Sequence, residues 1–140
     1  MILLDTNVIS EPWKPTPDRN VMAWIDAQIV DTLYLSTITV AELRFGISIM
    51  PQGQRRDTLR RRLEGEVLPL FDSRILPFDL QASQAYAELM ARAKASGRAI
   101  GQADAFIAAT AASRGLRVAT RDTSPFEAAG LTTFNPWTAR

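Results

Sequence analysis

The stretch Ile2-Leu3-Leu4-Asp5-Thr6-Asn7 places three consecutive apolar residues directly before a carboxylate. A short run of this kind is typical of a strand that is buried on both faces, as in a parallel sheet. In an open α/β sheet such a strand delivers the residue that follows it to the carboxyl edge, where functional sites form. We therefore expect Asp5 at the mouth of a site.

Outward from this strand, strand-like and helix-like runs alternate along the chain. Further strands are predicted at residues 33–35, 74–78, 116–119 and 131–134. Helices are predicted at residues 18–29, 39–50, 54–68, 79–97 and 101–114. The helix after Asp79 is expected to bury a face that includes Leu80, Tyr86, Ala87, Met90 and Ala93. This alternation predicts an α/β fold with a parallel sheet and helices on both of its faces.

The composition excludes several kinds of site. The 140 residues suffice for one domain, expected over residues 1–140, and include no histidine and no cysteine. Ser-His-Asp and Cys-His catalysis, thiolate zinc sites and disulfides are therefore absent. Neither lysine, Lys14 or Lys94, lies in a P-loop pattern. The N-terminus lacks a signal-peptide pattern, and no apolar stretch reaches the ~18 residues that span a membrane, so we expect a cytoplasmic protein without a membrane partner.

Four carboxylates fall where an α/β domain would place a site: Asp5, Glu42, Asp104 and Asp122. Each follows a strand-like run or lies near the start of a helix-like run. Converging carboxylates repel one another unless a cation or a proton holds them together. Because only oxygen ligands are available, the expected cation is Mg²⁺ or Mn²⁺.

Each of these acids also has a purely structural interpretation. Asp5 and Asp104 can stabilise the first turn of a helix, and Asp122 can stabilise a turn. Glu42 follows Thr39 at the spacing of a capping box. Asp104, however, is the only charged residue between Arg98 and Arg114, and an unpaired carboxylate in such apolar surroundings is costly. A shared site explains all four positions at once.

An arginine cluster lies in the helix predicted at residues 54–68. Its members are Arg55, Arg56, Arg60, Arg61 and Arg62. The cluster is consistent with a solvated helix face, with an RNA-backbone contact or with a partner-protein surface. We assign Arg55, Arg56, Arg60 and Arg61 as candidate RNA contacts because an acidic site alone would repel a polyanion.

The order of motifs resembles the PIN-domain ribonucleases, and within them the VapC-type toxins and their FitB-like group. The motifs begin at Ile2-Leu-Leu-Asp5, Thr39-Val-Ala-Glu42, Ala103-Asp104, Val118-Ala-Thr-Arg-Asp122 and Phe134-Asn-Pro-Trp137. Many relatives carry a further acid where this chain has Pro125, so the fourth acid is assigned to Asp122. The resemblance extends over nearly the whole chain.

The resemblance implies a five-stranded parallel sheet of order 3-2-1-4-5 between helices. It also implies an endoribonuclease that depends on Mg²⁺ or Mn²⁺, with Asp5, Glu42, Asp104 and Asp122 as catalytic acids. Asp5 and Asp104 would bind the metal, and Thr6 and Thr120 match small hydroxyl residues that contact substrate. The implied partners are RNA, a second copy of the chain, and a small DNA-binding antitoxin of the ribbon-helix-helix type.

Two alternatives remain open from the sequence. A haloacid-dehalogenase-like phosphatase also begins with a strand that ends in Asp, but it needs a second acid where this chain has Asn7, and it needs a catalytic lysine. The other alternative is a non-catalytic PIN-like module that binds RNA or its antitoxin. The sequence leaves open the RNA target, the number of metal ions and any action on DNA.

Overall fold

The computed structural model of the protein describes residues 1–138 and is built around a five-stranded sheet of order β3-β2-β1-β4-β5. The strands are β1 (Ile2–Leu4), β2 (Leu33–Ser36), β3 (Ile75–Leu76), β4 (Arg117–Ala119) and β5 (Thr133–Phe134). All neighbouring strands run parallel. The predicted fold class, parallel pairing and strand order are confirmed.

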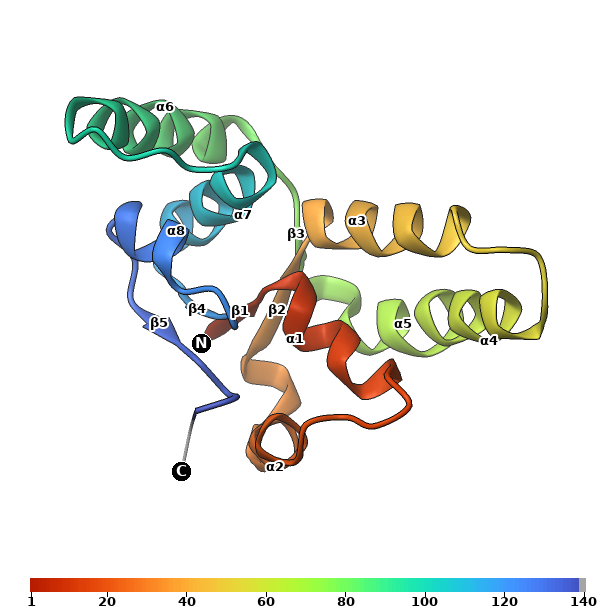
Figure 1. The fold of residues 1–140 in the computed structure, drawn as a ribbon. Coiled ribbons are helices and arrows are strands. Elements are labelled where there is room, and N and C mark those ends of the chain that lie inside the picture. The colour runs from red at the N-terminus through yellow and green to blue at the C-terminus, as the bar shows by residue number, and fades with distance from the viewer. Residues whose placement is uncertain (139–140) are drawn as a thin grey trace.

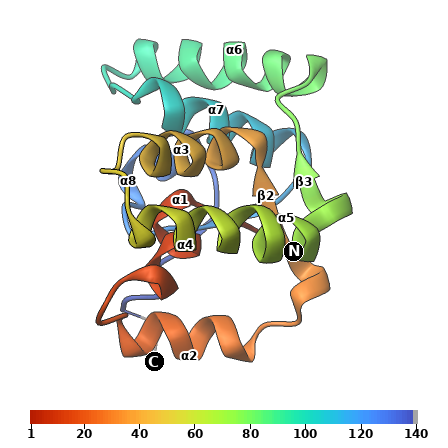
Figure 2. The ribbon, with the colours of Figure 1, turned by 90° about the vertical axis from the view of Figure 1, so that its right-hand side faces the viewer.

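Helices cover both faces of the sheet (Figure 1). One side carries α1 (Thr6–Ser10), α2 (Arg19–Ala27), α3 (Thr37–Ser48), α4 (Gln54–Arg62) and α5 (Leu68–Phe71). The other side carries α6 (Leu80–Ala95), α7 (Gln102–Ser113) and α8 (Ser124–Ala128). Seen after a quarter turn, α6 and α2 form the two outermost layers of the molecule (Figure 2).

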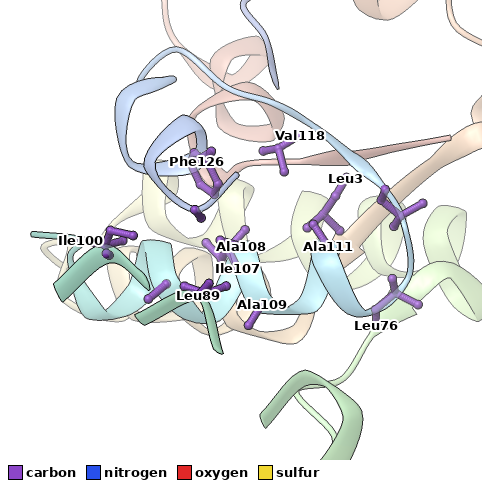
Figure 3. Close-up of a cluster of buried hydrophobic side chains, with 14 residues drawn as sticks. Leu3, Leu76, Leu89, Ile100, Ile107, Ala108, Ala109, Ala111, Val118 and Phe126 are labelled. Carbon is purple, nitrogen blue, oxygen red and sulfur yellow. The ribbon is translucent and has the colours of Figure 1, made fainter. Parts of the chain in front are cut away.

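The side chains of β1 divide the core between these two faces. Leu3 packs against the cluster that contains Leu89 of α6 and Ile107 of α7 (Figure 3). Ile2 and Leu4 point the opposite way, into a cluster beneath α1, α2 and α5. Successive residues of a strand face opposite sides, so a fully apolar strand is required at this central position. Leu3 and Leu4 are 0% and 1% exposed, and each contributes roughly 1.5–3 kcal/mol by its burial.

Two helix starts are set by side-chain caps. Asp18 accepts hydrogen bonds from the backbone N–H groups at the start of α2, as its sequence position predicts. α3 begins at Thr37, two residues before the predicted start, because Ser36 accepts from Thr39 N at 3.0 Å and caps the helix. The end of α2 was also predicted wrongly, since the helix stops at Ala27 and Ile29 is 71% exposed.

The helix predicted at residues 54–68 is present but irregular. α4 continues through a wider π-helical turn, Leu63–Val67, into α5. Its apolar residues Leu59 and Leu63 pack against Leu43 and Ile47 of α3. This contact holds α3 and α4 together as a helical pair.

The buried face of α6 agrees only in part with the prediction. Asp79 caps the helix by accepting from Ala82 N at 2.9 Å, as expected. Leu80 is nevertheless 87% exposed and Ala87 is exposed as well. Ala93 is buried as predicted, and Tyr86 and Met90 pack partly buried against the core, but the helix also buries Ala82 and Leu89. The apolar positions in this segment fit more than one helical phase, and packing against α7 selects the phase that the sequence does not specify. No helix within residues 1–138 is both long enough and apolar enough to cross a membrane.

Candidate active site

Asp5 lies where β1 ends, between two strands of the sheet. Its backbone N–H donates to Ala119 O at 2.9 Å and extends the β1–β4 ladder by one residue. The chain order of the strands changes direction beside β1, which is the position where open α/β sheets form their sites. Asp5 also caps α1, because its Oδ1 accepts from Thr6 N at 2.8 Å. The capping role and the site position therefore coexist in one residue.

Thr120 holds the other carboxylate oxygen of Asp5. This threonine directly follows β4 and is completely buried. Its hydroxyl donates to Asp5 Oδ2 at 2.8 Å and accepts from Asp122 N at 3.2 Å. One buried hydroxyl thus fixes the orientation of Asp5 and the turn that carries Asp122.

Thr6 connects Asp5 with Glu42 in a similar way. While its N–H donates to Asp5, its hydroxyl donates to Glu42 Oε1 at 2.6 Å. Glu42 lies in α3 and is exposed, so this short hydrogen bond to a carboxylate gives its side chain a defined position. The capping-box interpretation of Glu42 is wrong, because Ser36 caps the helix. Both threonines assigned to substrate use their hydroxyls to hold acids.

Asp104 and Asp122 line one open cleft. Asp104 lies in the first turn of α7 and is half-buried, whereas Asp122 is exposed. Gly101 lies directly beside this carboxylate, because a Cβ atom added there would be in ordinary van der Waals contact, 3.7 Å from Asp104 Oδ2. The cleft has a volume of about 600 Å³ and is lined by Arg98, Ala99, Gly101, Asp104, Asp122, Ser124, Pro125, Glu127 and Ala128.

The pKa values of Asp5 and Asp104 reflect both burial and repulsion from the neighbouring acids. Burial raises the pKa of Asp5 to about 6, against hydrogen bonds from Thr120 and Thr6 that lower it, while Asp104 and Glu42 add repulsion. Burial also raises the pKa of Asp104, and repulsion from Asp122 and Glu42 raises it further. The structure therefore brings all four sequence-assigned acids into one region of negative charge.

These acids suit a hard divalent cation. Burial and mutual repulsion destabilise their ionised forms, and a bound cation relieves both effects. Within residues 1–138 no three acidic side chains converge closely enough to form a complete protein cage. Mg²⁺ is usually held by one or two carboxylates and keeps several waters, so this arrangement fits it. Asp5 and Asp104, the most desolvated pair, are the candidate ligands.

Sequence reasoning missed the polar residues that support the site. Asn7 Oδ1 accepts from Arg121 N at 3.3 Å and ties α1 to the turn that carries Asp122. Thr39 is completely buried, and its hydroxyl lies 3.1 Å from that of Thr6. Asn7 lies two residues after Asp5, and Thr39 lies three residues before Glu42. This proximity in the sequence hinted at a supporting role, but only the packed structure shows which residue supports which acid.

The arginine cluster of α4 lies apart from this network. Arg55 donates to Trp13 O at 2.9 Å and so fixes a loop, and Arg56 has its Nε buried. Arg60 and Arg61 are exposed. Among the described residues, no arginine of this cluster lines the cleft or hydrogen-bonds to one of the four acids.

Comparisons of the sequence and of the structure with known proteins point to the same family. The profile of the family described as PIN domain matches residues 2–131. The chain is 68% identical over 137 residues to VapC ribonuclease Y4jK of Sinorhizobium fredii, covering 98% of each protein. It is 53% identical to Toxin FitB of Neisseria gonorrhoeae over 98% of this chain and 99% of that protein. A solved structure of FitAB bound to an IR36 DNA fragment contains a chain that is 49% identical and superposes with a TM-score of 0.97, over 100% of this chain and 98% of that one.

Proposed function

This chain belongs to the PIN-domain family, within its VapC- and FitB-type group, and from that membership and the site we propose that it is a metal-dependent endoribonuclease. In this proposal residues 1–140 form a single PIN domain that acts as the toxin of a toxin–antitoxin pair. The names of its relatives, a VapC ribonuclease and Toxin FitB, support both parts of the proposal.

One observation carries the proposed chemistry. The carboxylate of Asp5 is buried, held by two hydrogen bonds, and close enough to Asp104 and Glu42 for their charges to raise its pKa. Burying an acid beside other acids is unfavourable for the isolated protein. A cation that binds there recovers the lost free energy and places positive charge where a phosphodiester can approach.

Each residue has a distinct part in the proposed mechanism. When bound, Mg²⁺ or Mn²⁺ lowers the pKa of a coordinated water and neutralises charge on the phosphodiester. Asp5 and Asp104 would hold the cation, and Thr6 and Thr120 fix the orientation of Asp5. Glu42 and Asp122 are exposed and act directly or through water. In-line attack of water on the phosphorus would break the P–O3′ bond and leave a 5′-phosphate and a 3′-hydroxyl, and it requires no histidine.

The proposed partners follow from the same family. They are an RNA substrate, a second copy of this chain, and a small antitoxin of the ribbon-helix-helix type that binds DNA. The similarity to the FitAB structure that contains DNA supports a DNA-binding partner. The acidic site can accept a basic antitoxin side chain, most favourably arginine, in place of metal or substrate.

The test is a comparison of Asp5→Ala and Asp104→Ala with the wild-type protein. Purified wild-type protein should cleave cellular RNA in Mg²⁺, and both variants should lose that activity while keeping the far-ultraviolet circular dichroism of the folded chain. Sequencing the cleaved ends should reveal 5′-phosphates. Full activity in folded Asp5→Ala protein would contradict the assignment of this site.

A further inference from the structure

Arg98 brings positive charge to the acidic cleft. Among the described residues that line this cleft, it is the only basic one, beside the carboxylates of Asp104, Asp122 and Glu127. RNA must bring a chain of phosphates to the acids, and the acids alone repel it. A cation in the lining itself can offset that repulsion at the place where cleavage is proposed.

The backbone at Arg98 is fixed by the end of α6. Gly97 adopts a φ of 69°, the left-handed conformation that glycine favours at helix ends. Arg98 N then donates to Ala93 O at 2.8 Å, which completes a Schellman-type cap. Two residues later, Ile100 is buried at 8% exposure, and Gly101 is the N-cap residue of α7. The arginine therefore projects from a short loop that is anchored at both ends.

The guanidinium of Arg98 is available to a ligand. Arg44, Arg74 and Arg114 each form an ion pair with a carboxylate. Within residues 1–138 Arg98 has no carboxylate within 4.0 Å, although it shares the cleft with three of them. An exposed arginine fork can bind two oxygens of one phosphate, which gives both charge neutralisation and orientation.

From this position we propose that Arg98 binds a backbone phosphate of single-stranded RNA at the rim of the catalytic cleft. The proposal rests on the proposed ribonuclease function and adds a substrate-binding residue to it. The exposed arginines of α4 differ, because they can attract RNA to the surface but do not line the cleft. Arg98 orients the strand next to Asp104 and Asp122.

The experiment measures RNA binding separately from cleavage. Asp5→Asn protein serves as the cleavage-inactive background. Arg98→Gln, Arg98→Lys and the matched control Arg92→Gln are each added to it, because Arg92 is exposed on nearby α6 but does not line the cleft. Fluorescence anisotropy with a random-sequence pool of short labelled single-stranded RNAs gives Kd at several salt concentrations. Thermal midpoints verify that each variant is folded.

Arg98→Gln should weaken binding roughly tenfold. It should also reduce the log–log salt slope by about 0.7, the value for one lost phosphate contact on a single strand. Arg98→Lys should keep the slope but recover only part of the affinity, and Arg92→Gln should change neither. In the otherwise wild-type enzyme with Mg²⁺, Arg98→Gln should raise KM far more than it lowers kcat.

Two results would overturn the proposal. One is unchanged affinity and salt slope in folded Arg98→Gln protein. The other is an equal loss in Arg98→Gln and Arg92→Gln, which would show a general charge effect. Failure of the ribonuclease function itself is distinguishable, because the wild-type protein would then cleave no RNA in Mg²⁺ whatever residue stands at position 98.

Discussion

The hydroxyl of Thr120 donates a 2.8 Å hydrogen bond to Asp5 Oδ2, although the two residues are 115 positions apart in the chain. The contact joins the end of β4 to the end of β1 in the interior of the protein. Both side chains are buried, so solvent is poorly placed to replace this hydrogen bond if it is lost. Breaking it should affect stability and the site together.

Thr120→Val should therefore destabilise the protein by about 1–3 kcal/mol, since it leaves a buried carboxylate oxygen without its donor. The same change releases Asp122 N from its acceptor, so we expect RNA cleavage to fall roughly ten- to a hundredfold. Urea unfolding and initial cleavage rates measure the two effects. Thr120→Ser keeps the hydroxyl and is the control. Equal behaviour of the valine and serine variants would show that the hydrogen bond is unimportant.

Asp5→Asn should stabilise the metal-free protein at neutral pH. The pKa of Asp5 is raised from 3.8 to about 6 by burial, so the folded state binds the proton more tightly than the unfolded state. Stability should therefore fall as pH rises between these two values, by up to about 3 kcal/mol. Asparagine cannot ionise, so the Asp5→Asn variant should not lose stability in this pH range. Unfolding curves in EDTA should show a gain for the variant at pH 7 that disappears below the unfolded pKa, and no gain at pH 7 would contradict the burial argument.

Divalent cations should stabilise the wild-type protein and have little effect on the Asp5→Asn variant. Mg²⁺ or Mn²⁺ should raise the thermal midpoint of the wild-type protein above pH 6, where Asp5 is ionised, and should support RNA cleavage. Asp5→Asn should show little shift. EDTA should abolish cleavage, and Zn²⁺ should replace Mg²⁺ poorly because the site offers only oxygen ligands. Undiminished cleavage after thorough chelation would rule out the metal.

The arginines of α4 should contribute to RNA attraction and not to chemistry. Arg60→Gln combined with Arg61→Gln should weaken RNA binding and lower the log–log salt slope by up to about 1.4, for two phosphate contacts on a single strand. The turnover rate at saturating RNA should remain unchanged. Arg55 is left intact in this test because it holds Trp13. If binding does not change, this helix face serves a partner or the solvent.

The antitoxin should inhibit the enzyme by occupying the acidic site. The purified complex should have low ribonuclease activity, and replacing the arginines of the antitoxin one at a time with glutamine should identify the residue that enters the cleft. The wild-type toxin should elute as a homodimer in size-exclusion chromatography with light scattering. A complex with full activity would contradict inhibition at this site.

The sequence predicted the fold well wherever burial leaves little choice. Three apolar residues before Asp5 suffice to place β1 at the centre of the sheet, because a central parallel strand is covered on both faces. The helix predicted at residues 101–114 carries a single charge, Asp104, before Arg114, and α7 accordingly buries Ala105, Ile107, Ala108 and Ala109. The buried face of α6 was partly wrong, because alanines fit several helical phases and only the contact with α7 selects one.

The acids could be predicted as a set, but their connections could not. Asp5 and Asp104 stand out because each carboxylate occurs in an apolar run. Nothing in the sequence indicates that Thr6 donates to Asp5 and to Glu42 at once, since that arrangement depends on how α1 packs beside α3. Arg98 was overlooked for a related reason, because a single arginine in a loop has no pattern until the cleft exists.

The pairing of β1 with β4 also determines when a newly made chain can become active. β1 is among the first segments to be synthesised, yet Leu3 and Leu4 pair with Val118 and Ala119, close to the end of the chain. Asp5 meets Thr120, and Asp122 joins the site, only after most of the protein has been translated. A chain that ends before β4 therefore lacks both Thr120 and Asp122 and cannot form the complete site.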